Sequence, residues 1–176
     1  MSKILLETIN LSKTYKHVNG NINLFNNLNL KIKQGDLVAL VGPSGSGKSS
    51  LLHLLALLDE PTKGDIKLNN VLTRKFADEK KDETRRKNIS IIFQDDNLLN
   101  DFTAIENVMM PSIIKGENMK NAKNKAKTIL KKIKILNRAH HFPKELSGGE
   151  QQRVAIARAI IAETNIILAD EPTGNL

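Results

Sequence analysis

The chain of 176 residues contains no cysteine and no tryptophan, and its aromatic fraction is only 3%. Without cysteine, disulfides and thiolate metal sites are excluded. With so few aromatic side chains, the core must be built from Leu, Ile and Val. The hydrophobic fraction of 40% is ordinary for a globular protein, and the length suits one domain with a sizeable core.

Long apolar runs are also missing. The strongest one, residues 51–58, contains His53, which we interpret as a packing residue, and it is far too short to span a bilayer. Near the N-terminus, Glu7 stands where a signal peptide would need its apolar stretch. We therefore expect a cytosolic chain.

Positive charge is in excess, with a net charge of +8. Such an excess is typical of proteins that bind nucleic acid or an anionic membrane surface. Because Lys and Asn recur throughout the chain, we favour the alternative that the lysines are merely solvated, and we expect no nucleic-acid partner. The basic stretch 115–134 allows two interpretations, lipid headgroups beside a membrane partner or a solvated face, and we again favour solvation.

The pattern of apolar residues predicts strands that alternate with helices. Leu28, Leu30 and Ile32 alternate with polar residues, as in a half-buried strand, and residues 19–21 mark a turn. The continuous apolar run 37–41 predicts a strand covered on both faces. The remaining expected elements are buried strands at 89–93 and 166–169, a short strand within 61–70, helices over 49–58, 118–136 and 155–162, an exposed helix or loop at 75–87, and a helix capped by Thr103. This order favours an α/β fold with a largely parallel sheet.

A glycine-rich segment follows the apolar run. Residues 42–49 match G-x-x-x-x-G-K-[ST] at every fixed position, between a predicted strand and a predicted helix. The glycines let backbone N–H groups converge on phosphate oxygens, and the helix points its positive N-terminus at the same anion. Lys48 would neutralise the β- and γ-phosphates of a bound nucleotide, and Ser49 would hold Mg²⁺. The candidate nucleotide contacts in this loop are Gly42, Pro43, Ser44, Gly45, Ser46, Gly47, Lys48, Ser49 and Ser50.

A second motif narrows the class of phosphate-binding protein. Residues 146–153, Leu-Ser-Gly-Gly-Glu-Gln-Gln-Arg, resemble the signature motif of the ABC ATPases. Ser147, Gly148, Gly149 and Glu150 would open a helix whose N-terminus can bind a further phosphate group. In that family the phosphate belongs to nucleotide held by the partner subunit. The resemblance therefore implies a head-to-tail homodimer with two ATP molecules at its interface.

The other motifs of that family follow in order. The resemblance implies that Asp170 supports Mg²⁺, that Glu171 acts as general base, and that Gln94 contacts Mg²⁺ and the attacking water. Tyr15 stands where the family places an aromatic ring that stacks on adenine. The resemblance covers the whole chain. It implies a P-loop NTPase (RecA-like) core, an N-terminal antiparallel β subdomain, and a helical subdomain of roughly residues 95–150 that carries the signature motif.

A finer resemblance concerns the transported substrate. Residues 51–55, 97–108 and 168–176 are similar to the ATPases of lipoprotein-releasing ABC exporters, within a larger group that includes macrolide exporters. This implies inner-membrane permease subunits as partners and a position on the cytoplasmic face of the bacterial inner membrane. The alternatives are an ATPase of a macrolide or peptide exporter, or a nucleotide-binding remnant without turnover. A soluble ABC ATPase of DNA repair or translation is disfavoured, because neither a long coiled coil nor a second cassette is present.

The resemblance also predicts what should follow residue 176. The family continues with an Asp that completes the D-loop, with further strands, and with a switch histidine. His141 precedes Asp170 and cannot fill that role, and His140 and His141 have no ligand partners in view that would predict a metal site. We therefore expect residues 1–176 to form an incomplete cassette, with an uncovered sheet, poor solubility and little or no ATP turnover by this chain alone.

Overall fold

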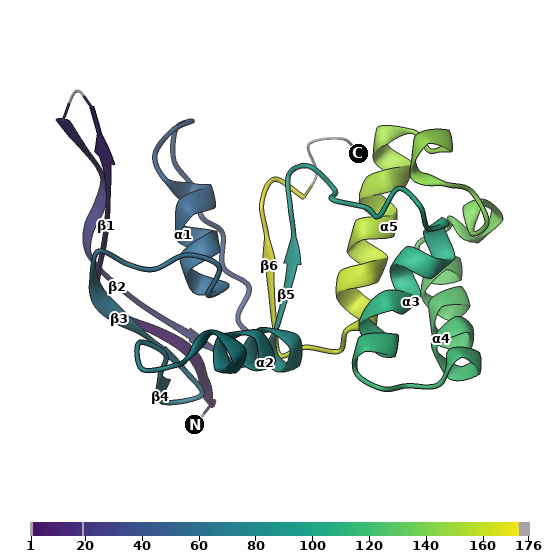
Figure 1. Ribbon diagram of the computed structural model, residues 1–176, viewed down its shortest axis with the longest axis horizontal. Coiled ribbons are helices and arrows are strands. Elements are labelled where there is room, and N and C mark those ends of the chain that lie inside the picture. The colour runs from purple at the N-terminus through teal and green to yellow at the C-terminus, as the bar shows by residue number, and fades with distance from the viewer. Residues whose placement is uncertain (1, 19, 173–176) are drawn as a thin grey trace. The chain divides into compact units, whose positions relative to one another are not determined.

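The computed structural model describes residues 2–18 and 20–172 (Figure 1). The chain divides into two compact units, Met1–Arg85 and Arg86–Leu176, and each is described by itself. Asn19 of the predicted turn and residues 173–176 of the lipoprotein-type segment lie outside the described residues.

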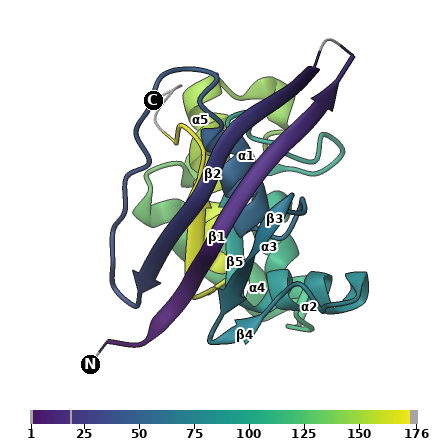
Figure 2. The same ribbon diagram turned by 90° about the vertical axis from the view of Figure 1, so that its left-hand side faces the viewer.

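The N-terminal unit is built on a four-stranded antiparallel sheet with the order β2-β1-β3-β4. Strand β1 (Ile4–His17) pairs along one edge with β2 (Gly20–Lys33), and Figure 2 shows these two as a long ribbon. Its other edge pairs with β3 (Lys63–Leu68), which is followed by β4 (Val71–Leu72). The alternation predicted in β2 is confirmed, since Leu28, Leu30 and Ile32 are half-buried between exposed polar residues.

Two helices accompany this sheet. Helix α1 (Lys48–Leu55) buries leucines on one face, and it ends earlier than predicted because Leu57 adopts a left-handed conformation with φ 59°. Helix α2 (Asp78–Asn88) buries no residue, which confirms the prediction of an exposed segment.

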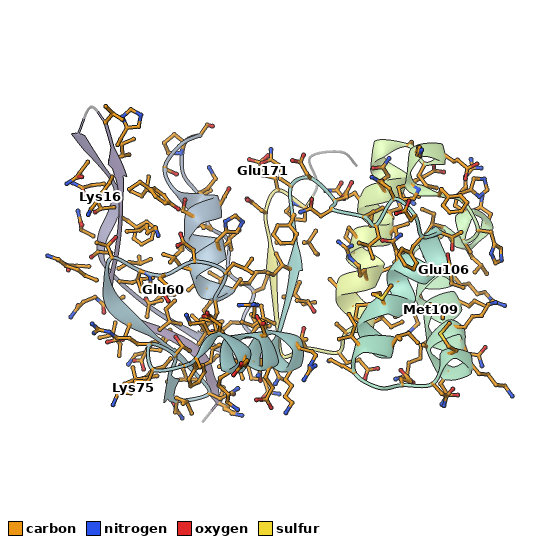
Figure 3. All side chains as sticks on the ribbon, viewed as in Figure 1. Lys16, Glu60, Lys75, Glu106, Met109 and Glu171 are labelled. Atoms are coloured by element: carbon orange, nitrogen blue, oxygen red, sulfur yellow. The ribbon has the colours of Figure 1, made fainter. Side chains whose placement is uncertain are left out.

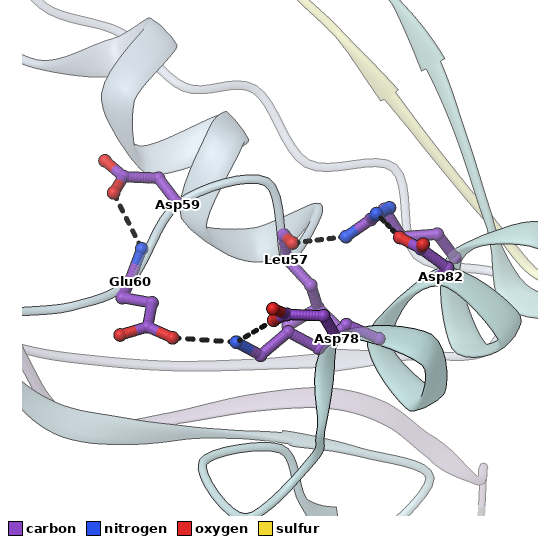
Figure 4. A network of polar contacts seen from close by, with 7 residues as sticks. Leu57, Asp59, Glu60, Asp78 and Asp82 are labelled. Atoms are coloured by element: carbon purple, nitrogen blue, oxygen red, sulfur yellow. Dashed lines mark hydrogen bonds and ion pairs between the residues drawn. The ribbon is translucent and has the colours of Figure 1, made fainter.

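A polar network ties α2 to the turn that follows α1 (Figure 4). Lys81 lies 2.7 Å from a carboxylate oxygen of Glu60 and 3.3 Å from one of Asp78. Arg85 donates to the carbonyl oxygen of Leu57 and pairs with Asp82. Hydrogen bonding to Glu60 raises the pKa of Lys81. Because α2 buries no apolar side chain, these polar contacts fix its position.

The C-terminal unit contains three packed helices, α3 (Ala104–Ile114), α4 (Met119–Lys132) and α5 (Gly148–Ile161), which Figure 1 draws side by side. Short 3-10 turns at Leu136–Arg138 and Pro143–Glu145 connect α4 to α5. Thr103 stands at the N-cap position of α3, as predicted, but its side chain accepts no backbone hydrogen bond there. Its backbone N–H instead donates to the carboxylate of Glu106 at 2.8 Å. The helices enclose a core of small and aliphatic side chains: Ala104, Ile105, Val108, Met109, Ala122, Ala126, Leu130, Ile135, Ala139, Leu146, Val154, Ala157 and Ile161.

The same unit contains a parallel pair, β5 (Ile89–Ile92) and β6 (Ile166–Ala169), with Ile89 opposite Ile166. A crossover that holds α3, α4 and α5 separates the two strands, as a parallel pair requires. The predicted strands are confirmed, but β6 is not buried on both faces. Ile166 and Leu168 are buried, whereas Ile167 is 49% exposed.

The prediction of a buried strand at residues 37–41 is wrong. These residues form no strand, Leu37 is fully exposed and Val41 is 90% exposed. A parallel strand exists only as part of a ladder. Among the described residues of the N-terminal unit, only antiparallel strands form, and none pairs with this run. The apolar run therefore indicates residues that favour burial, but no strand of this unit pairs with them.

Gly64 in β3 provides a test of the N-terminal packing. Its φ is +84°, and an added Cβ would lie 2.3 Å from the carbonyl oxygen of Asn10 and 2.5 Å from that of Ile9, where the β1–β3 register shifts. We predict that Gly64→Ala lowers the free energy of unfolding by about 2 kcal/mol, from strain plus backbone overlap. Urea unfolding followed by circular dichroism measures this.

Gly35 provides the matched control. Its φ is +87°, but nothing lies within 4 Å of an added Cβ. Gly35→Ala should therefore cost only the left-handed strain of about 1 kcal/mol. Equal losses in the two variants would show that the approach of Gly64 to β1 has no energetic weight.

Candidate functional site

The glycine-rich loop runs directly into the N-terminus of α1. Gly45 and Gly47 have φ values of 78° and 89°, a region that residues with a Cβ rarely adopt. A Cβ on Gly42 would lie 2.8 Å from the hydroxyl of Ser46, so glycine there allows the loop to close tightly. The loop thus ends at a helix N-terminus, where unpaired backbone N–H groups favour an anion.

Lys48 already has two partners in the loop. Its ammonium group donates to the carbonyl oxygens of Gly42 and Pro43, at 2.9 and 3.0 Å. An ammonium group has three N–H donors, so one remains for a phosphate oxygen. The next residue, Ser49, lies exposed in the first turn of α1. The loop thus offers one fixed cation and one accessible hydroxyl.

Tyr15 lies on β1 in the same unit, and the residue is 41% exposed. Its hydroxyl donates to a carboxylate oxygen of Asp59 at 3.0 Å. The ammonium group of Lys13 lies 4.7 Å from the centre of the ring and 2.7 Å from the same carboxylate. Lys13 itself is 7% exposed and also donates to the carbonyl oxygen of Glu60. The ring is therefore held by a buried cation and a hydrogen bond.

Sequence reasoning missed Lys13 and Asp59. Lys13 precedes Tyr15 by two residues, so both side chains project from the same face of the strand. This two-residue spacing could have predicted that they lie close together. Asp59 is distant in sequence and carried no signal. Burial alone would raise the pKa of Asp59, but hydrogen bonds from Lys13, Glu60 and Tyr15 outweigh it and lower the pKa. The carboxylate therefore stays ionised at neutral pH.

In the C-terminal unit, polar residues meet at the carboxyl ends of β5 and β6. The backbone N–H of Asp170 donates to the carbonyl oxygen of Ile92 at 2.9 Å, which extends the parallel ladder. The side-chain amide of Gln94 donates to the carboxylate of Glu171 at 3.3 Å. Parallel pairing thus places Gln94, Asp170 and Glu171 at one edge.

Glu171 has an unusual backbone. Its φ is 46°, in the left-handed region that is uncommon for residues other than glycine. Its carbonyl oxygen accepts a hydrogen bond of 3.3 Å from the side chain of Gln152, which is fully buried in α5. Gln152 lies within the signature segment, but its contact with Glu171 was not predicted. This bond links the helix that begins at the signature motif to the turn that presents Glu171.

The signature residues form a helix start. Ser147 caps α5 by accepting from the backbone N–H of Glu150 at 3.3 Å, and the carboxylate of Glu150 accepts from the backbone N–H of Ser147 at 2.8 Å. Glu150 also pairs with Arg138 at 2.9 Å. The Ser147 N–H and then Arg138 lower the pKa of Glu150. Gly148 and Gly149 leave the helix N-terminus clear of side chains.

The segment after Gln94 is fixed by Arg158 of α5. Its guanidinium donates to the carbonyl oxygens of Asn97 and Asp96, at 2.7 and 2.8 Å. Burial lowers the pKa of Arg158, and burial raises the pKa of Asp96 despite the nearby cation. Sequence reasoning missed this arginine, although a lone charge among the alanines and isoleucines of a helix was a visible signal.

The predicted site residues thus fall into separate groups within the two units. The N-terminal unit holds the phosphate loop and Tyr15, and the C-terminal unit holds the edge with Gln94, Asp170 and Glu171 and the helix start at Ser147. Among residues 2–18 and 20–172, no cluster of three His, Asp or Glu side chains is placed to hold a metal ion. In that part of the chain, no helix is long and apolar enough to cross a membrane.

This combination of phosphate loop, signature helix and strand-end carboxylates defines an ATP-binding cassette. The comparisons agree, because the ABC transporter family model matches residues 25–174, and the chain belongs to that family. The chain is 49% identical to the lipoprotein-releasing system ATP-binding protein LolD of Rickettsia bellii, over the whole chain and 77% of that protein. It is 44% identical to the LolD of Legionella pneumophila, over the whole chain and 78% of that protein.

Solved structures give the same result. The ATP-binding cassette MJ0796, in a dimeric post-hydrolysis state bound to ADP and Pi, superposes with a TM-score of 0.93 at 41% identity. The match covers 98% of this chain and 76% of that one. A second structure of MJ0796, described as a dimeric bacterial ABC transporter cassette, gives the same values. The expected α/β P-loop fold and the resemblance to ABC ATPases are confirmed.

The contacts around Tyr15 lead to a prediction about nucleotide affinity. Tyr15 is the only tyrosine and there is no tryptophan, so the tyrosine fluorescence of this chain reports on that ring alone. We predict that ATP quenches this fluorescence. We also predict that Asp59→Asn weakens ATP binding about fivefold, roughly 1 kcal/mol, because Lys13 loses its ionic partner and the ring is less well held.

Glu60→Gln is the matched control. It removes the same charge at the neighbouring residue, where the carboxylate is exposed and contacts Lys81 rather than the Tyr15 hydroxyl. The carbonyl of Glu60 that Lys13 uses is unchanged. ATP titrations of the two variants that give one dissociation constant would contradict a role for Asp59 in holding the ring.

Proposed function

We propose that this chain is the ATP-hydrolysing subunit of an ABC exporter that releases lipoproteins from the bacterial inner membrane. The observation that carries the proposal is identity of 49% and 44% to two LolD proteins along the entire chain. The phosphate loop and the edge with Gln94, Asp170 and Glu171 support it, because they supply the groups that ATP hydrolysis requires.

In this proposal each candidate residue has the role in ATP binding that its chemistry allows. The N–H groups of the phosphate loop and the ammonium group of Lys48 bind the phosphates, and Tyr15 stacks on adenine. Ser49, Gln94 and Asp170 offer hydroxyl, amide and carboxylate oxygens, which are the ligands that Mg²⁺ prefers. If these residues hold Mg²⁺, the ion would supply charge neutralisation at the phosphates.

Glu171 then acts as general base. The amide of Gln94 donates to its carboxylate, which orients that carboxylate at the strand ends. A water oxygen attacks the γ-phosphorus, its proton passes to Glu171, and the bond from the γ-phosphorus to the β–γ bridging oxygen breaks, which releases ADP and phosphate. The Gln152 bond to the carbonyl of Glu171 supports the left-handed backbone that presents the carboxylate.

The second phosphate contact comes from a partner subunit in this proposal. The N-terminus of α5, with Ser147 as cap and two glycines after it, offers backbone N–H groups to a phosphate. A homodimer would bring this N-terminus to nucleotide on the partner, and dimeric MJ0796 supports that arrangement. We further propose that permease subunits bind on the cytoplasmic side near the segment after Gln94, which Arg158 fixes.

The first experiment is ATP hydrolysis with Mg²⁺ by this chain, by the chain extended with the C-terminal segment of the Rickettsia bellii relative, and by Glu171→Gln in both forms. We predict that Glu171→Gln lowers kcat in the extended form by about 10²–10⁴-fold, the usual contribution of a general base. Binding of ATP, read from Tyr15 fluorescence, should remain.

Glu79→Gln provides the control, since it changes an exposed glutamate at the start of α2. If the two glutamate variants hydrolyse ATP at the same rate, Glu171 is not the base. If no form hydrolyses ATP although Tyr15 fluorescence still reports binding, the chain is a nucleotide-binding remnant.

The substrate class is tested through the membrane partner. We expect the extended form to co-purify with the permease subunits of a lipoprotein-releasing system and not with those of a macrolide exporter. Selective recovery with the macrolide permease would overturn the assignment to lipoprotein release while leaving the ATPase assignment intact.

A further inference from the structure

The positive charge of this chain is concentrated in one short segment. Residues 115–134 hold eight lysines and one glutamate, a net charge of +7, whereas the whole chain has +8. Acidic and basic residues therefore nearly balance elsewhere. This segment begins directly after α3 and comprises the turn and α4, so one helix of the C-terminal unit carries most of the excess.

Four of these lysines form a single stripe along α4. We define the basic stripe as Lys120, Lys123, Lys127 and Lys131, whose spacing of three and four residues places them on one face. All four are exposed, and Figure 3 shows nitrogen-tipped side chains that extend outward from α4. The adjacent face of the helix buries Ala122, Ala126 and Leu130 in the core.

Within the described residues no lysine of the basic stripe forms an ion pair. Hydrogen bonds from Thr103 lower the pKa of Glu106, and the nearby charge of Lys123 adds to that effect without an ion pair. Lys125, off the stripe, pairs with Glu117 and Glu163, and Lys115 donates to the carbonyl oxygen of Ala162. No comparable partner lies beside any of the four stripe lysines in residues 2–18 and 20–172. Like charges at i and i+4 destabilise a helix. The stripe therefore disfavours α4 in isolation, and an external anion would relieve that repulsion.

We propose that the basic stripe of α4 binds the surface of an anionic phospholipid bilayer. The stripe is about 16 Å long, from a rise of 1.5 Å per residue, so it presents a row of charges to an extended anionic surface rather than to one phosphate. The α4 sequence contains no aromatic residue for base stacking and no arginine for bidentate phosphate recognition. Lysines as point charges suit a lipid surface better than a nucleic acid.

This inference rests on the proposed function for its location, because an exporter subunit works beside the inner membrane. It adds a contact that is independent of ATP and of the permease. Each lysine close to an anionic leaflet contributes roughly fivefold to the partition constant, and the attraction falls off within about 10 Å at moderate salt. The full stripe then contributes roughly two orders of magnitude or more.

The test is sedimentation of the chain with vesicles, without nucleotide. One set contains phosphatidylcholine alone and the other contains phosphatidylglycerol as well. We expect binding only to the second set, loss of binding at about 0.5 M salt, and a decrease of about 100-fold when all four stripe lysines are changed to Gln. Gln keeps the helix propensity of Lys, so α4 should still form. The corresponding change of all four to Arg should retain binding.

A control variant changes four exposed lysines outside α4 to Gln, which lowers the net charge equally: Lys16, Lys33, Lys75 and Lys144. Equal loss of vesicle binding in the control and the stripe variant would overturn the proposal, because net charge alone would then explain it. Displacement of the bound chain by millimolar inorganic phosphate would also overturn it, in favour of a single-phosphate site. A stripe-dependent affinity for a DNA duplex without vesicle binding would assign the stripe to nucleic acid instead.

Failure of this proposal is distinguishable from failure of the proposed function. A chain that binds and hydrolyses ATP but ignores anionic vesicles would refute only the lipid contact. If the extended form binds the vesicles through the stripe but never hydrolyses ATP, the lipid contact stands and the proposed ATPase role is refuted.

Discussion

Parallel pairing of β5 with β6 is the interaction on which the catalytic edge depends. The hydrogen bond from Asp170 to Ile92 continues the ladder past the last strand residues, so the turns after both strands begin at the same level. This register brings the side-chain amide of Gln94 within 3.3 Å of the carboxylate of Glu171. The crossover between the strands contains α3, α4 and α5. The side chain of Gln152 in α5 donates a hydrogen bond to the carbonyl oxygen of Glu171. The core that packs the helices thus also positions the strand-end carboxylates.

In the N-terminal unit a different constraint operates. The long β1–β2 ribbon carries Lys13 and Tyr15 on one face, and the turn after α1 returns Asp59 to them. Burying a lysine is costly unless it is paired, and Lys13 satisfies that condition with one carboxylate and one carbonyl oxygen. The same contacts immobilise the exposed ring of Tyr15. An aromatic surface that is already ordered loses little conformational freedom when a planar ligand stacks on it.

Charged side chains have different surroundings on α2 and on α4. Around α2, acids and bases alternate and form the network that attaches the helix to its unit. On α4, four lysines share one face and form no ion pair within the described residues. A residue count treats both segments alike as Lys-rich surface. The tertiary structure separates them, because it shows which charges have partners inside the molecule and which face outward.

The sequence by itself determined the elements and the chemistry. Glycine spacing requires a tight loop before α1, Ser147 and Glu150 form a cap within four residues, and apolar runs form β5 and β6, because each of these depends on neighbours in the chain. The tertiary structure decided what depends on distant contacts. These are the hydrogen bonds from Gln152 to the turn at Glu171 and from Arg158 to the segment after Gln94, and the bond between Tyr15 and Asp59. The exposure of residues 37–41 was also decided there. An apolar run states a preference for burial, but only other elements can supply the pairing and the cover.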